Sequence, residues 1–229
     1  MCYWVGEWYS LVKSLDGGTS WSSVYPPMGP IIAIAVSPSN TSTVYASKGD
    51  KLIRTRDGGQ SWLSLASVGK AYDVSSLIVH PTDSDTVYAV TERYGVYKST
   101  DGGGSWMSLN QTLPNQGVDL QCPALAIHPM RPELVFLACN MYGIFYSMDA
   151  GLTWSLLGSG FNPFLRINSL AVAPISGQVS FHPTLRLVDQ PYPYPEPYSV
   201  YLPLVMKAAS PPFIVYVGTE AGVWRLVGP

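Results

Sequence analysis

The chain has 229 residues and a net charge of -2, and only 12% of its residues are charged. Lys and Arg are scattered rather than clustered, which argues against nucleic acid as a partner, because phosphate recognition needs a basic patch. No apolar run is longer than six residues, as in Ile31 to Val36, and such runs are too short to span a membrane. We expect no signal peptide at the start of this sequence, because residues 1–4 lack a basic segment followed by an apolar one.

The cysteines and histidines do not indicate metal or cofactor chemistry. The three cysteines have no metal-binding spacing, and no phosphate loop or calcium loop is present. Each histidine precedes a proline, and two of them, His80 and His128, stand at a repeat position that holds Ser37 or Ala173 elsewhere. This position suits a residue at the end of a strand better than a catalytic base. We therefore expect no metal and no cofactor.

One eight-residue motif, which we call the box, occurs four times. It reads Ser or Thr, any residue, Asp, Gly or Ala, Gly, any residue, Ser or Thr, Trp, and its copies are residues 14–21, 55–62, 99–106 and 147–154. The Asp-to-Asp spacings are 41 (16 to 57), 44 (57 to 101) and 48 (101 to 149) residues. A repeat period in the forties is typical of β-propellers, in which each repeat forms one blade.

Four short strands are expected in each repeat. The first ends at a proline, and its copies are residues 31–38, 75–81, 123–129 and 168–174. The second carries an aromatic residue seven positions after that proline, namely Tyr45, Tyr88 or Phe136. The third runs into the box, as in residues 95–99, and the fourth begins at the box Trp. Four antiparallel strands in forty-odd residues make a propeller blade.

The box itself has the chemistry of a turn. Its Asp is expected to accept hydrogen bonds from backbone N–H groups two or three residues further on, while its glycines adopt left-handed backbone angles. Its Trp is expected to be buried as the next strand begins. A single active site does not need four equivalent acids, so the box residues are expected to be structural. They are Asp16, Trp21, Asp57, Trp62, Asp101, Trp106, Asp149 and Trp154.

Counting strands from these landmarks gives 18 in five sheets. The first repeat lacks its first strand and the last lacks its fourth, so the sheets have 3, 4, 4, 4 and 3 strands. We expect an all-β propeller of about five four-stranded antiparallel blades within a single domain over residues 1–229. The ring is expected to be open or incomplete, as a fragment of a larger propeller or as a chain that associates through exposed edges.

A proline- and tyrosine-rich insertion interrupts the last repeat at residues 175–213. From Pro174 to Tyr216 the chain has 42 residues, where other repeats have seven. Its central run, residues 190–197, is expected to be extended. Because strands in a blade alternate in direction, the turns after the first and third strands share one end of each sheet. We call this the box end, and we expect the insertion to leave from it.

The four boxes resemble the Asp-box, or BNR, repeat. This repeat is known in bacterial sialidases, in xyloglucanase-type glycoside hydrolases, in the sortilin receptor domain and in photosystem-assembly propellers. The resemblance covers residues 1–174 and 213–228 and implies a β-propeller with structural boxes that lie away from the ligand side. It also implies an extracellular or periplasmic location. It does not select a function, because the family contains enzymes and non-enzymes. The fourth box departs from the pattern at Ala150.

The opposite end of each sheet, which we call the open end, is where a ligand is expected. Sialidases resemble one another in an arginine triad that binds the substrate carboxylate. Of the arginines in this chain, only Arg93 and Arg166 are expected at the open end. A xyloglucanase-type enzyme needs two carboxylates, and Asp73 and Asp119 are the best pair, although solvated loop acids are the simpler interpretation. The remaining ligand-binding candidates at the open end are Tyr72, Glu92, Tyr94, Tyr142 and Glu220.

Cys122 and Cys139 are expected to lie close together, because they flank the first and second strands of one hairpin. Cross-strand neighbours come near disulfide distance. Two interpretations stay open, a disulfide bond and a pair of buried free thiols.

The sequence favours a non-catalytic binding or scaffold module with a protein or glycan ligand. The first alternative is a glycoside hydrolase, of sialidase or xyloglucanase type, or a fragment of one. The second is an assembly factor for a larger complex. Neither the arginine triad nor a convincing acid pair is evident, so catalysis is not expected.

Overall fold

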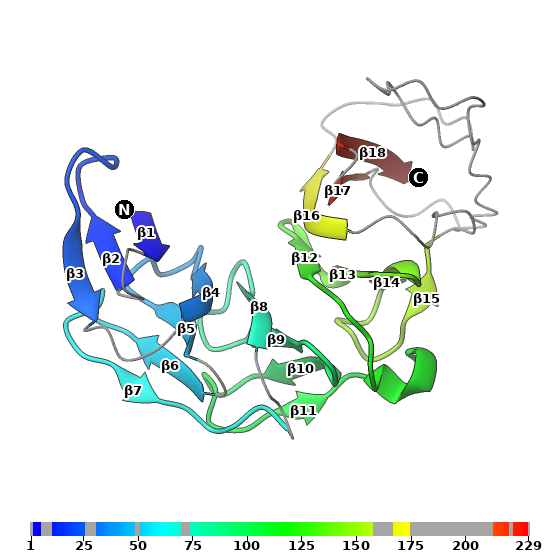
Figure 1. The fold of residues 1–229 in the computed structure, drawn as a ribbon, viewed down its shortest axis with the longest axis horizontal. Coiled ribbons are helices and arrows are strands. Elements are labelled where there is room, and N and C mark those ends of the chain that lie inside the picture. Colours follow the sequence, from blue (N-terminus) through cyan, green and yellow to red (C-terminus); the bar gives the residue numbers. More distant parts are fainter. Residues whose placement is uncertain are drawn as a thin grey trace. The chain divides into compact units, whose positions relative to one another are not determined.

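The structure, a computed structural model, describes residues 2–5, 11–25, 31–48, 51–69, 74–157, 167–174, 213–219 and 222–228 (Figure 1). The chain divides into two compact units. Unit 1 comprises residues 1–110 and 114–119, and unit 2 comprises residues 111–113 and 120–229.

Unit 1 contains three antiparallel sheets, in which sequence neighbours are also neighbours in space. The first sheet is β1 (Cys2–Val5), β2 (Leu11–Ser14) and β3 (Ser22–Tyr25). The second is β4 (Ile31–Val36), β5 (Val44–Lys48), β6 (Lys51–Thr55) and β7 (Leu63–Ser64). The third is β8 (Val74–Val79), β9 (Val87–Thr91), β10 (Gly95–Ser99) and β11 (Met107–Ser108), followed by the 3-10 turn η2 (Pro114–Gly117).

Unit 2 contains the remaining two sheets. The fourth is β12 (Ala124–His128), β13 (Arg131–Cys139), β14 (Gly143–Ser147) and β15 (Ser155–Leu156). The fifth is β16 (Ile167–Pro174), β17 (Phe213–Thr219) and β18 (Gly222–Gly228). The described residues therefore form 18 strands in sheets of 3, 4, 4, 4 and 3, which confirms the predicted strand pattern.

One detail of the strands differs from the sequence prediction. The fourth strand of a repeat begins one residue after the box Trp rather than at it, and β7, β11 and β15 have only two residues each. In the fourth sheet the turn lies before Arg131, and β13 already includes Pro132. Pro132 is tolerated there because its missing N–H falls where the β12–β13 pairing is interrupted between Ile127 and His128.

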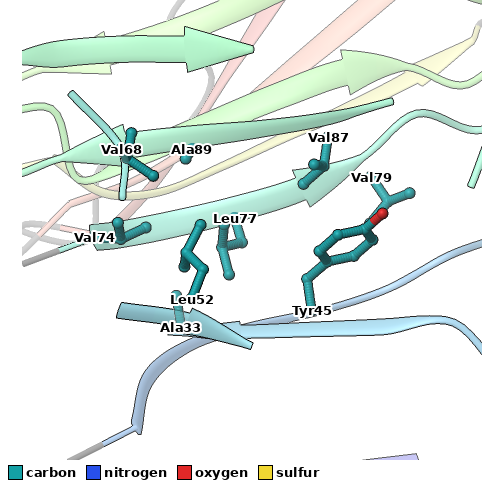
Figure 2. Packing of buried hydrophobic residues seen from close by; sticks show 9 residues of the cluster. All are labelled: Ala33, Tyr45, Leu52, Val68, Val74, Leu77, Val79, Val87 and Ala89. Atoms are coloured by element: carbon teal, nitrogen blue, oxygen red, sulfur yellow. The ribbon is translucent and has the colours of Figure 1, made fainter. Parts of the chain in front are cut away.

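The core of unit 1 lies between the second and third sheets (Figure 2). Tyr45 is fully buried, and its hydroxyl donates a hydrogen bond to the Ser84 carbonyl at 2.9 Å. Leu52 and Val87 are also buried in this cluster. β-branched and aromatic residues on facing strands therefore join successive sheets through apolar contact, as stacked repeats require. Its buried members are Ala33, Tyr45, Leu52, Val68, Val74, Leu77, Val79, Val87 and Ala89.

The core of unit 2 forms in the same way between the fourth and fifth sheets. Phe136 of β13 is fully buried, and Ile167 of β16 is 2% exposed in the same cluster. Leu170 and Val172 of β16 are partly buried and pack against this cluster. Its buried members are Ala124, Leu134, Phe136, Ala138, Ile144, Leu157 and Ile167.

Several residues named from the sequence lie outside the described residues. They are Tyr72, Asp73, Arg166, Glu220 and the insertion from residue 175 to residue 212. Within the described ranges, no helix has the length and apolarity needed to cross a membrane. Among those same residues, no group of three or more His, Cys, Asp or Glu side chains is placed to hold a metal ion.

Candidate binding surface at the open end of the third sheet

Each box Asp is surrounded by its own turn. In the third box, Oδ1 of Asp101 accepts hydrogen bonds from the Ser99 hydroxyl at 2.7 Å and from the Ser105 N–H at 2.9 Å. Its Oδ2 accepts one from the Ser105 hydroxyl at 2.7 Å. The N–H that it binds lies four residues further on, which corrects the predicted two or three. The other boxes repeat this network around Asp16, Asp57 and Asp149.

These hydrogen bonds keep the box carboxylates ionised. The Ser105 and Ser99 hydroxyls hold the pKa of Asp101 well below its usual range, and the pKa values of Asp16 and Asp57 are lowered by the corresponding bonds. Burial raises the pKa of Asp149, but hydrogen bonds from Thr153 and Ser147 outweigh it and the net shift is downward. A carboxyl group with a lowered pKa is a poor general acid. The geometry therefore fits the structural role expected of the box.

The box tryptophans are not equally buried, which corrects the prediction for this position. Trp154 is 6% exposed, whereas Trp21 is 44% exposed. Trp62 and Trp106 are half-buried, and their Nε1–H groups donate to the Val24 carbonyl at 2.9 Å and to the Ala66 carbonyl at 3.2 Å, both in the preceding repeat. The indole therefore serves partly as a hydrogen-bond link between repeats and is not only a buried apolar group.

A basic residue three positions before the box Asp also links repeats. Lys13 Nζ donates to the Gly58 carbonyl at 2.9 Å, and an Arg54 guanidinium nitrogen donates to the Gly102 carbonyl at 2.6 Å. Both acceptors are the first Gly of the following box. Recurrence of a basic residue at this spacing was the signal in the sequence. These cations therefore link successive repeats at the box end.

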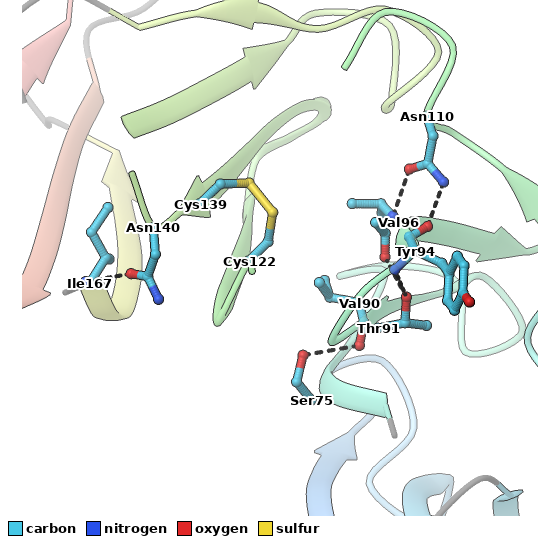
Figure 3. The surroundings of a disulfide bond; sticks show 11 residues. Ser75, Val90, Thr91, Tyr94, Val96, Asn110, Cys122, Cys139, Asn140 and Ile167 are labelled. Carbon is cyan, nitrogen blue, oxygen red and sulfur yellow. Dashed lines mark hydrogen bonds between the residues drawn. A yellow bond between two sulfur atoms is a disulfide. The ribbon is translucent and has the colours of Figure 1, made fainter. Parts of the chain in front are cut away.

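The open end of the third sheet is organised by the buried side chain of Asn110. Its Oδ1 accepts a hydrogen bond from the Val96 N–H at 2.7 Å, and its Nδ2 donates to the Tyr94 carbonyl at 2.7 Å (Figure 3). Gly95 and Gly117 approach this amide with φ angles of 71° and 83°, and a Cβ on either would overlap it. Asn110, which follows β11, therefore fixes the turn between β9 and β10 through these two hydrogen bonds.

The polar candidates of unit 1 meet on this fixed turn. The Asp119 N–H donates to the Arg93 carbonyl at 2.7 Å, and the Arg93 side chain forms an ion pair with Asp119 at 3.6 Å. Both side chains are well exposed, at 66% and 72%. Glu92 is exposed and Tyr94 is half-buried on the same turn, and the Tyr94 N–H donates to Thr91 Oγ1 at 3.0 Å. The structure therefore brings together Glu92, Arg93, Tyr94 and Asp119 from the candidates named in the sequence.

The open end of the fourth sheet, in unit 2, has a different construction. Cys122 and Cys139 form a disulfide bond with an S–S distance of 1.99 Å, so the structure has the bridged of the two alternatives (Figure 3). Next to it, the Asn140 side chain accepts a hydrogen bond from the Ile167 N–H at 2.9 Å. Tyr142 follows in the same turn and is 40% exposed.

His128 has a structural position at the end of β12. Its Nδ1 accepts hydrogen bonds from the Met130 N–H at 3.2 Å and the Arg131 N–H at 3.1 Å. Burial lowers the pKa of His128, and the Arg131 charge lowers it further, while Glu133 opposes the shift. The neutral imidazole therefore closes the turn at the box end. His80 acts similarly in the third sheet, where its Nδ1 accepts from the Thr82 N–H at 3.3 Å.

Comparison with known proteins supports the propeller fold. The model of the Sortilin-Vps10 family (sortilin, neurotensin receptor 3) matches residues 9–115. The GH74 xyloglucanase from Xanthomonas campestris is similar with a TM-score of 0.63 and 13% identity, over 96% of this chain and 33% of that one. YCF48 bound to D1 peptide gives a TM-score of 0.56 and 13% identity, over 99% of this chain and 60% of that one. A chain of the COPII outer coat vertex on membranes gives a TM-score of 0.60 and 9% identity, over 96% of this chain and 52% of that one.

At such identities, the likeness to solved structures shows the fold alone. The chain spans about a third of the length of the GH74 xyloglucanase and three fifths of YCF48. Comparison with curated proteins gives no significant sequence match. The family match over residues 9–115, the boxes and the antiparallel sheets together support a β-propeller of the Asp-box, or BNR-like, type.

Proposed function

We propose that the chain is a non-catalytic binding module that takes up a protein segment at the open end of the third sheet. The main support for this proposal is the fixed turn at residues 91–95, where Arg93 and the neighbouring Asp119 are exposed side by side. A rigid turn loses little conformational entropy when a ligand binds. Preorganisation of this kind is what a recognition surface needs.

The chemistry of the turn suits a peptide. Arg93 offers several N–H donors, and Asp119 offers acceptor oxygens, so together they match the donors and acceptors of an extended backbone. Their mutual ion pair is exposed, and exposed pairs contribute little to stability, so either group can exchange its partner for a ligand group at small cost. Val118, which is 46% exposed, and the half-buried Tyr94 add apolar contact area beside the charges.

Glycoside hydrolysis is the alternative, and the described acids support it less well. Hydrolysis needs two carboxyl groups about 5–10 Å apart, one of which carries a proton. Asp119 is already paired with the Arg93 guanidinium. Its predicted partner, Asp73, lies outside the described residues. A role as assembly factor is one form of the binding function and is compatible with it.

Two further observations support a protein ligand and an exported protein. Of the similar structures, one is described with a bound peptide and another as part of a coat vertex. The Cys122–Cys139 disulfide is the kind of bond that persists in oxidising compartments, so we place the protein outside the cytoplasm. We also retain the proposal that residues 1–229 act as one propeller domain, with self-association through sheet edges as a second mode of contact.

The test is selection of peptides from a displayed random library, followed by affinity measurements with point variants. Arg93→Ala and Asp119→Ala are each expected to lower the affinity for the selected peptides about tenfold, as substitutions of hot-spot residues do. Arg56→Ala and Asp85→Ala are the matched controls, because this pair is also exposed in unit 1, at 54% and 41%, but lies at the box end. The controls are expected to retain full affinity.

The same preparations are assayed for hydrolysis of xyloglucan and of a sialoside. Turnover that disappears in Asp119→Asn would establish the hydrolase instead. Equal loss of affinity in the Arg93 and Arg56 variants would also contradict the proposal, because the peptide would then not bind specifically at the open end of the third sheet.

A further inference from the structure

The connection between β11 and β12 is the longest that joins one sheet to the next. It comprises residues 109–123, whereas the other three connections are residues 26–30, 65–73 and 157–166. Its residues 114–119 belong to unit 1, and we call them the left-handed loop. Long connections in a compact repeat are where functional residues concentrate. The left-handed loop also carries the carboxylate of the proposed peptide surface.

The backbone of the left-handed loop is strained. Among the residues that the structure describes, five non-glycine residues have a positive φ angle, and three of them lie in this loop. They are Asn115 at 49°, Gln116 at 51° and Asp119 at 56°, and Gly117 between them has a φ of 83°. Left-handed angles cost free energy in residues that have a Cβ, so they persist only where the surrounding structure imposes them. Contacts outside the loop must therefore hold it.

Two contacts with the third sheet hold the left-handed loop. The Asp119 N–H donates to the Arg93 carbonyl at 2.7 Å. Gly117 approaches the Asn110 side chain so closely that a Cβ on this glycine would lie 2.6 Å from the amide carbon. The same amide forms two hydrogen bonds with the backbone of the turn between β9 and β10 (Figure 3). The amide of Asn110 is therefore a common support for the turn and for the loop.

Space, rather than the φ angle, explains why residue 117 is a glycine. Ala150 has a φ of 58° in the fourth box, so an alanine can hold a left-handed angle in this fold. At residue 117, however, a Cβ would overlap the amide of Asn110, which is 5% exposed and is held by its two hydrogen bonds. The amide cannot move aside without losing these bonds. The close approach of Gly117 to Asn110 therefore fixes where the loop lies.

We propose that Gly117 is a positioning residue for peptide binding, because its contact with Asn110 holds the left-handed loop so that Asp119 stands beside Arg93. This inference rests on the peptide-binding function proposed above. Gly117 is buried, so it acts on the peptide through Asp119 rather than by direct contact. Strain that is held in place by a close packing contact preorganises the carboxylate before the peptide arrives.

Hydrogen exchange without any peptide is the first test. Gly117→Ala is expected to speed exchange of the Asp119 amide several-fold, because a displaced loop weakens its hydrogen bond to the Arg93 carbonyl. Gly17→Ala is the matched control, because Gly17 has a φ of 73° but its Cβ would meet nothing within 4 Å. The control is expected to leave this rate unchanged. An unchanged rate in Gly117→Ala would overturn the inference and leave the peptide-binding function standing.

A double-mutant cycle with the selected peptides is the second test. Gly117→Ala alone is expected to lower the affinity about tenfold, as Asp119→Ala does. The double variant is expected to lose about tenfold as well, and not about a hundredfold, because both changes act through one carboxylate. An additive loss would overturn the inference. Unchanged affinity in both Arg93→Ala and Asp119→Ala would instead reject the peptide-binding function itself, and with it this role of Gly117.

Two variants of Gln116 cover the case in which Gly117→Ala fails to fold. Gln116 is exposed, so its replacement does not disturb the core. Gln116→Val is expected to lower the peptide affinity several-fold, because a β-branched residue resists the φ of 51°. Gln116→Gly is expected to retain affinity, because glycine adopts this angle readily. Equal losses in the two variants would overturn the inference, because they would mean that the Gln116 side chain itself contacts the peptide.

Discussion

The two ends of the sheets are built on different rules. At the box end, each of the four turns has the same hydrogen-bond network. In each, the box Asp carboxylate accepts hydrogen bonds from the hydroxyl and the N–H of the Ser or Thr four residues further on. At the open end, the third sheet uses a buried Asn110 and an exposed ion pair, whereas the fourth uses a disulfide. Repeated chemistry therefore carries the fold, and chemistry that occurs once is where the recognition surface should be sought.

The largest expected effect comes from the most buried box tryptophan. Trp154→Ala is expected to cost about 3–5 kcal/mol of unfolding free energy, because the ring is 6% exposed and its removal leaves a cavity. Trp21→Ala, at 44% exposure, is expected to cost about 1 kcal/mol or less. Urea denaturation followed by circular dichroism measures both. Equal losses would mean that the box ends of the first and fourth sheets do not differ as described.

A smaller effect is expected at the open end from Asn110. Asn110→Ala removes the acceptor of the buried Val96 N–H and the donor to the Tyr94 carbonyl, and it is expected to cost about 1–3 kcal/mol. Asn110→Asp retains the acceptor but places a second carboxylate oxygen against the Tyr94 carbonyl at a buried position, so its cost should be as large or larger. Hydrogen exchange at Val96 would report the change locally. An unaltered exchange rate in Asn110→Ala would contradict the account of the fixed turn.

The pH dependence at the box end should be smaller still. The pKa of His128 is lowered by burial, so the folded state binds its proton more weakly than the unfolded state. The stability that this histidine contributes is complete above its unfolded pKa of about 6.5 and falls as the pH drops below that value. We expect the urea midpoint to fall between pH 7 and pH 5.

The matched variant for this prediction is His128→Asn, whose side-chain oxygen can replace Nδ1 as the acceptor for the Met130 and Arg131 N–H groups. Part of the pH dependence should remain in this variant, because burial lowers the pKa of His80 as well. A pH profile that is identical in the wild type and in His128→Asn would remove His128 from the explanation.

The sequence predicted the box end better than the open end. Asp16, Asp57, Asp101 and Asp149 recur at one period, so their turns and the strands between them follow from pattern alone. Asn110 has no counterpart in a repeat, and its role depends on a turn that is distant in sequence. The differing burial of Trp21 and Trp154 was equally invisible, because each ring depends on what the neighbouring repeat places against it.

The central claim is that fold and recognition are separated between the two ends. Two isosteric variants in unit 1 test it most directly, with urea midpoint and affinity for the selected peptides measured on each. Asp101→Asn is expected to lower the midpoint and retain affinity, because it weakens three hydrogen bonds of the box. Asp119→Asn is expected to lose affinity and retain the midpoint, because its side chain is exposed. A peptide affinity that falls in Asp101→Asn but not in Asp119→Asn would contradict the account.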